Sequence, residues 1–68
     1  MIEVDARGLS CPEPVLLTLD AIEAAGDEAV LVMVSDTNQR DNCKTQAQRK
    51  GKTVTVEQKG QDYYLTIQ

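Results

Sequence analysis

The feature that most constrains the fold is an uninterrupted apolar segment near the middle of the chain, Ala29 to Val34. Asp27 precedes it, and a polar stretch that begins at Ser35 follows it. A run of six residues is short for a helix, so the segment predicts a strand that is buried along most of its length. The remaining elements have to build a sheet around this strand and cover it.

The residues before this strand predict a strand followed by a helix. Residues 2 to 6 alternate apolar and polar side chains, which is typical of a half-buried strand. Residues 12 to 25 carry apolar side chains at helical spacing, and Gly26 follows as a stop signal. On this helix, the side chains that we expect to face the protein core are Val15, Leu19 and Ile22.

The segment after the central strand predicts a second helix over residues 39 to 50. It is polar, contains neither proline nor glycine, and ends before Gly51. Its apolar side is thin, because only Cys43 and Ala47 lie four residues apart on one face. We therefore interpret Cys43 as a core residue, with a resolving thiol for Cys11 as the alternative.

The C-terminal part predicts a β-hairpin. Residues 53 to 57 form a strand, residues 59 to 62 form a turn, and a last strand presents one apolar face made by Tyr63, Leu65 and Ile67. The order βαβαββ predicts an α/β (α+β) fold. This is a two-layer sandwich of two helices on a four-stranded mixed sheet, formed by residues 1–68 as one domain.

Composition excludes several kinds of chemistry. The chain has two cysteines, Cys11 and Cys43, and no histidine. A zinc site needs about four Cys or His ligands and a Cys-His catalytic pair needs an imidazole, so we expect no metal and no cofactor. No apolar stretch is long enough to cross a membrane and the N-terminus lacks the pattern of an export signal, so we expect a cytoplasmic protein with free thiols.

Charge is distributed unevenly along the chain. Residues 1 to 36 hold eight acidic side chains against one basic one, whereas residues 37 to 68 hold six basic side chains against three acidic ones. The basic half indicates either a solvated helix face or a surface for an acidic protein or RNA. The net charge of −4 and the absence of Phe and Trp argue against direct nucleic-acid binding.

The stretch Cys11-Pro12-Glu13-Pro14 stands where the first strand gives way to the first helix. Proline is best tolerated in the first turn of a helix, and the residue before a proline avoids helical geometry. We therefore expect Pro12 to be the first helical residue and Cys11 the N-cap, with Ser10 as an alternative cap. Either start places an exposed thiol at the positive end of a helix, where Arg7 could add a further charge. The competing interpretation is a small buried cysteine in a tight loop.

These residues resemble the TusA/SirA-like sulfur-carrier family, whose hallmark is a Cys-Pro-x-Pro motif after the first strand. Here the motif is Cys11-Pro12-Glu13-Pro14, and the lead-in Asp5-Ala6-Arg7-Gly8-Leu9 is also similar. The resemblance extends over the whole chain, including Gly51 after the second helix. The sequence departs from the family at Asp36-Thr37-Asn38, where many members have Asp-Pro, and at Cys43, where relatives tend to carry an aliphatic residue.

The resemblance implies a sulfurtransferase-type carrier. Cys11 would accept a persulfide sulfur from a cysteine desulfurase or a rhodanese-type donor and pass it to a downstream acceptor protein. Arg7, Pro12, Glu13 and Pro14 would shape the binding site around it. The small size agrees, because a domain of 68 residues can hardly enclose a pocket of about 300 to 1,000 Å³.

The alternative is a non-catalytic interaction or regulatory module, related to redox or selenium metabolism. It would use the basic second helix, or the side of the central strand that carries Leu31 and Met33. In that case replacement of Cys11 by alanine would leave cellular activity intact.

Overall fold

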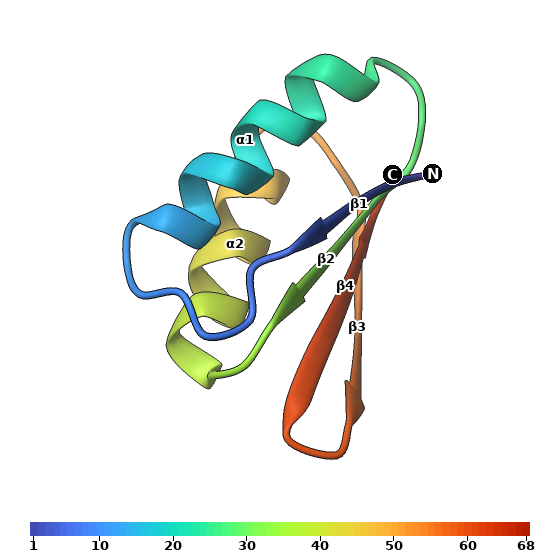
Figure 1. Ribbon diagram of the computed structural model, residues 1–68. Coiled ribbons are helices and arrows are strands. Elements are labelled where there is room, and N and C mark those ends of the chain that lie inside the picture. Colours follow the sequence, from blue (N-terminus) through green and yellow to red (C-terminus); the bar gives the residue numbers. More distant parts are fainter.

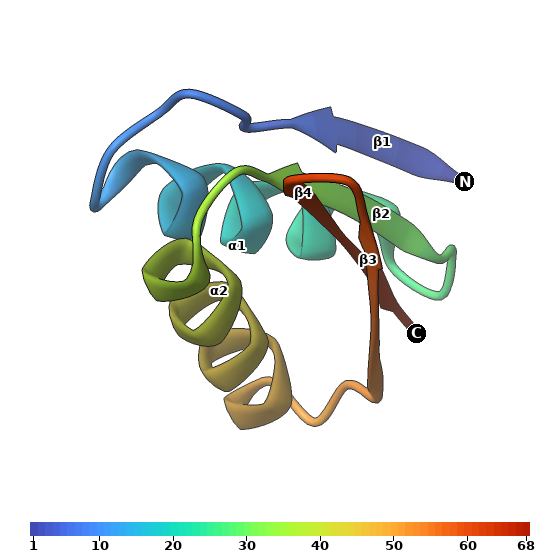
Figure 2. The same cartoon turned by 90° about the horizontal axis from the view of Figure 1, so that it is seen from below.

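The structure is a computed structural model that describes all residues, 1–68. Both helices lie on the same face of a single four-stranded sheet, and the two termini lie at the same end of it (Figure 1). Figure 2 shows the two layers from below, with the other face of the sheet free of helices. The elements are β1 (Ile2–Asp5), α1 (Glu13–Ala25), β2 (Val30–Val34), α2 (Thr37–Arg49), β3 (Val54–Lys59) and β4 (Asp62–Ile67).

The central apolar segment forms β2, as the sequence predicts. The strand order is β1-β2-β4-β3, with β2 parallel to β1 and antiparallel to β4. Val30, Val32 and Val34 turn toward the helices and are at most 1% exposed. β2 lies between β1 and β4, so its backbone N–H and C=O groups are hydrogen-bonded on both sides. This pairing matters because the strand is buried, and an unpaired polar group in the interior is costly. The predicted fold class and element order are confirmed.

The core lies between the sheet, chiefly β2 and β4, and the inner sides of α1 and α2. Pro14, Thr18, Ala21 and Ile22 are the buried residues of α1. The prediction placed Val15, Leu19 and Ile22 on this side, and the first two of these are only half-buried. The buried side is shifted because small side chains, Thr18 and Ala21, let α1 approach the sheet and α2 more closely than leucines would. Leu16 and Leu17 remain on the surface.

Helix α2 starts two residues earlier than predicted, at Thr37 rather than at 39, and ends at Arg49. The reason is the side chain of Asp36, which caps the helix by accepting a hydrogen bond of 2.8 Å from the Gln39 N–H. Cys43 and Ala47 are fully buried, as predicted. Neither helix has the length and apolar character needed to span a lipid bilayer.

The strand boundaries differ from the prediction by one or two residues. β2 starts at Val30 rather than at Ala29, and β3 runs from Val54 to Lys59 rather than over residues 53 to 57. The extension of β3 follows from the hairpin register, in which Lys59 pairs with Asp62 across a turn that begins with Gly60 at a φ of +63°. The first and last residues of a strand are set by backbone hydrogen bonds to the neighbouring strand. The alternation of apolar and polar side chains does not reveal where this pairing begins and ends.

The other face of the sheet is half-covered by its own side chains. Leu31 and Met33 of β2 face away from the helices and are half-buried. Thr66 and Tyr64 of β4 pair with them across the strands. Lys59 lies over the Tyr64 ring at 5.0 Å from its centroid. Neighbouring side chains therefore cover part of this apolar surface.

Replacement of Leu65 by alanine tests the position of the core. Leu65 is fully buried, so we expect Leu65→Ala to lower the free energy of unfolding by about 2 to 5 kcal/mol. Leu16→Ala, at a residue that is 54% exposed, is the matched control and should change it by less than about 0.5 kcal/mol. Urea unfolding followed by circular dichroism measures both, and equal losses in the two variants would contradict the assigned core.

Candidate functional site

The loop between β1 and α1 is tied to the end of β2. The Ala6 N–H donates to the Met33 carbonyl at 2.8 Å, and the Gly8 N–H donates to Ser35 Oγ at 2.9 Å. Ala6 is buried, and Gly8 has a φ of +79°, a conformation that favours glycine. These contacts fix the path of the chain as it leaves the sheet toward Cys11.

Arg7 holds the same loop to the β3-β4 hairpin. Its guanidinium donates two hydrogen bonds of 2.9 Å to the Asp5 carboxylate and one of 3.3 Å to Asp62. Hydrogen bonds from the Arg7 side chain, and then from its backbone N–H, lower the pKa of Asp5 from 3.8 to about 2. The same two carboxylates raise the pKa of Arg7. The charge of Arg7 is therefore partnered by these two carboxylates, and Arg7 makes no hydrogen bond to Cys11.

The start of α1 differs from both predicted versions, because Pro12 rather than Cys11 or Ser10 is the N-cap. The Pro12 carbonyl accepts the first helical hydrogen bond, from the Leu16 N–H at 3.1 Å. Before it, the Glu13 N–H donates to the Ser10 carbonyl at 3.0 Å and closes a turn across the cis Cys11-Pro12 peptide bond. This turn uses the residues that were expected to begin the helix, so α1 begins at Glu13.

Cys11 lies in this turn and is exposed, with its sulfur free. Pro12 and Glu13 beside it are exposed too, whereas Pro14 is buried and fixes the turn to the core. The helix end offers few donors to an anion, because both prolines lack an N–H and that of Glu13 is used. In the first turn only the Val15 N–H has no backbone partner. The turn therefore contributes exposure and rigidity more than positive charge.

Cys43 has the opposite environment. Its side chain is fully buried, and its sulfur is in hydrogen-bond contact with Thr18 Oγ1 at 3.4 Å. Burial raises the pKa of the Cys43 thiol, and the Thr18 hydrogen bond opposes this only partly. Thr18 Oγ1 also donates to the Pro14 carbonyl at 2.7 Å, so the contact joins α2 to the beginning of α1. Cys43 thus packs below the site instead of opening into it.

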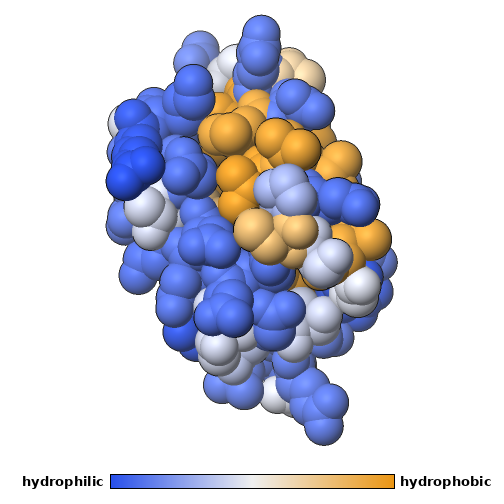
Figure 3. Space-filling model, turned by 90° about the vertical axis from the view of Figure 1, so that its left-hand side faces the viewer, coloured by the Kyte–Doolittle hydropathy of each residue, from blue (hydrophilic) through white to orange (hydrophobic).

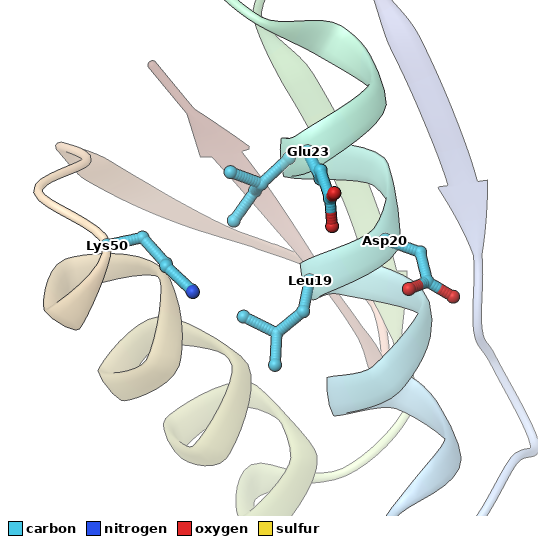
Figure 4. A pocket seen from close by; sticks show the side chains of 5 residues that line it. Leu19, Asp20, Glu23 and Lys50 are labelled. Carbon is cyan, nitrogen blue, oxygen red and sulfur yellow. The ribbon is translucent and has the colours of Figure 1, made fainter.

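The one pocket of the structure, of about 410 Å³, does not contain Cys11. It is an open groove between the second half of α1 and the end of α2 (Figure 4). Leu19 points into it from α1, and the Lys50 side chain extends across it from the end of α2. No cavity encloses the exposed thiol, so another molecule can reach Cys11 without entering a pocket.

Two residues that support the site were missed by the sequence analysis. Ser35 anchors Gly8, and Asp62 pairs with Arg7. The position of Ser35 could have been found, because residues that follow parallel neighbouring strands meet at one edge of the sheet. Asp62 lies 55 residues from Arg7 in the sequence, and no local pattern connects them.

Fold and site together define a small two-layer protein with one accessible thiol in a turn before a helix. The family model described as sulfurtransferase TusA matches residues 2–68, and the chain belongs to this family. The crystal structure of a SirA-like protein from Desulfitobacterium hafniense is similar, with 30% sequence identity and a TM-score of 0.92. That match covers 98% of this chain and 95% of the other. The comparison with curated proteins gave no match.

The two thiols should differ sharply in reactivity. An exposed thiol reacts with a disulfide reagent directly, whereas a buried one reacts only after the structure opens. We expect one equivalent to react at once in native buffer and a second only in denaturant, and Cys11→Ser to abolish the fast phase. Absorbance of the released thiolate measures both phases. Retention of the fast phase in Cys11→Ser would contradict the structure.

The ion pair between Asp5 and Arg7 should stabilise the fold in a pH-dependent way. Because folding lowers the pKa of Asp5 from 3.8 to about 2, the contribution is fully present above about pH 4 and is lost as the pH falls through about 2. The stability difference between wild type and Asp5→Asn should therefore be constant above about pH 4 and shrink toward pH 2. Urea unfolding across this range measures it, with Glu3→Gln on the same strand as control. A difference that stays constant down to pH 2 would contradict the assignment.

Proposed function

We propose that this member of the family carries sulfur as a persulfide on Cys11, between a donor protein and an acceptor protein. The observation that supports this most strongly is the exposure of Cys11 in a turn that Pro14 fixes to the core. A sulfur that is exchanged between proteins has to be reached in line by another sulfur, and an accessible turn provides that approach. The donor would be a cysteine desulfurase or a rhodanese-type protein.

In the loading step the Cys11 thiolate attacks the terminal sulfur of the donor's persulfide. A sulfur–sulfur bond forms on Cys11, the bond between the donor's cysteine and that terminal sulfur breaks, and the donor leaves as a thiolate. The proton lost by the Cys11 thiol balances the one that the donor cysteine regains. No external oxidant or reductant is required, because one persulfide replaces another.

In the unloading step the acceptor attacks the terminal sulfur held on Cys11. The sulfur–sulfur bond on Cys11 breaks and the Cys11 thiolate is released, so the carrier is ready for another cycle. The chain contains no histidine, and its only pocket lies away from Cys11. Activation of the acceptor therefore belongs to the partner protein, and this chain holds and presents the sulfur.

The neighbours of Cys11 have distinct roles in this proposal. Pro12 and Pro14 hold the turn in one conformation, so the Cys11 side chain projects from the surface in a fixed direction. Glu13 is exposed beside the thiol and would contact a partner directly. Arg7 acts at a distance, because its ion pairs with Asp5 and Asp62 hold the loop that leads to Cys11.

Mass spectrometry of the intact protein tests the proposal. After incubation with a cysteine desulfurase and cysteine, the wild type should gain the mass of one sulfur atom, and a reductant should remove it. Cys11→Ser should gain none, whereas Cys43→Ala, which retains the exposed thiol, should be loaded like the wild type. Equal loading of wild type and Cys11→Ser would overturn the proposal.

A further inference from the structure

The surface of α1 that faces away from the sheet carries two leucines among acidic residues. Glu13, Leu16, Leu17, Asp20 and Glu23 follow one another at helical spacing on this side, and all five are exposed. We call these five residues the outer stripe. Leu16 is 54% exposed and Leu17 is 39% exposed, which makes them, with Met1, the large apolar side chains most open to water.

The leucines of the outer stripe lie close to the reactive sulfur along the helix. Leu16 is hydrogen-bonded through its N–H to the Pro12 carbonyl, so it is one turn beyond the residue that follows Cys11. One helical turn rises about 5 Å, which is within the footprint of any protein that touches Cys11. Figure 3 faces the side of the molecule where the loop before α1 and the start of that helix lie, and it shows a hydrophobic area there.

We propose that the outer stripe is the docking surface for the sulfur donor protein, whose own contact surface has an apolar centre bordered by Lys and Arg. This inference rests on the proposed function, since it names the chemistry of the partner that loads Cys11. Leu16 and Leu17 supply the apolar contact beside the sulfur. Glu13 on one side and Asp20 and Glu23 on the other select the basic border.

The charge of α1 supports a basic partner. The helix carries acidic residues along the outer stripe, and its sequence contains no lysine or arginine. Lys50 lines the same groove as Asp20 and Glu23 but forms no ion pair with either of them (Figure 4). These carboxylates are therefore free to pair with a partner, and repulsion between like charges disfavours an acidic one.

A second copy of this chain does not fit the outer stripe. α2 is basic, but its exposed side chains are all polar, so it offers nothing to the two leucines. The other face of the sheet offers Leu31 and Met33, but the exposed Glu3 pairs with Leu31 from β1, and the exposed Glu57 lies on β3, beyond Tyr64 of β4. Those charges would face the acidic residues of the stripe. Anionic lipid and RNA are disfavoured by the same repulsion.

Binding of a purified cysteine desulfurase, measured by calorimetry in a Cys11→Ser background, tests the surface without sulfur transfer. We expect the pair Leu16→Gln and Leu17→Gln to weaken binding by about tenfold or more. Asp20→Lys with Glu23→Lys should also weaken it, and should abolish the loss of affinity with rising salt. The matched control, Glu3→Lys with Glu57→Lys, makes the same change in net charge on the other face and should bind like its parent.

Wild-type affinity in both the leucine pair and the charge-reversed pair would overturn the docking surface, as would tighter binding after charge reversal. A loss confined to Glu3→Lys with Glu57→Lys would also overturn it, by placing the contact on the sheet.

Loading by inorganic polysulfide, a small donor that needs no docking, separates this result from the proposed function. If polysulfide loads Cys11 equally when the same surface substitutions are made in the chain that retains Cys11, the carrier chemistry stands even where the docking surface fails. If the wild type is loaded by neither polysulfide nor desulfurase, both are overturned.

Discussion

The parallel pairing of β1 with β2 is the constraint on which the rest of the structure depends. Two parallel neighbours require a crossover, and here α1 crosses the sheet to connect them. The loop that enters α1 must then lie at the edge where both strands end, within reach of the carbonyl of Met33 and the hydroxyl of Ser35. A buried Pro14 fixes the far side of the turn. Cys11, between these attachments, is the part of the loop that faces water.

Much of the fold could be predicted because each element carries its own local signal. The valines of β2 and the alternation in β1 specify strands, and the glycines mark the ends of helices and the hairpin turn. The errors lie where tertiary contacts decide. The buried side of α1 uses Thr18 and Ala21 because they allow close packing against α2, a demand that an apolar pattern does not register. The strand ends depend on pairing in the same way.

The candidate site could be located from the sequence, but its geometry could not be. A cysteine beside two prolines marks a turn before a helix, yet the turn closed by Ser10 and Glu13 moves the N-cap to Pro12. That shift reduces the free N–H groups expected near the sulfur. The pairing of Arg7 with Asp62 could not be predicted from the sequence either, because Asp62 belongs to the hairpin, 55 residues further along the chain. Pairing with it gives Arg7 a part in holding the loop.

The central claim is that the sulfur carried by this protein resides on the exposed Cys11 and not on the buried Cys43. Peptide mapping of the sulfur-loaded protein under non-reducing conditions tests it most directly, because cleavage after Arg40 separates the two cysteines. The account predicts that the additional sulfur is found only in the peptide that contains Cys11. Additional sulfur in the Cys43 peptide, or divided evenly between the two, would contradict it.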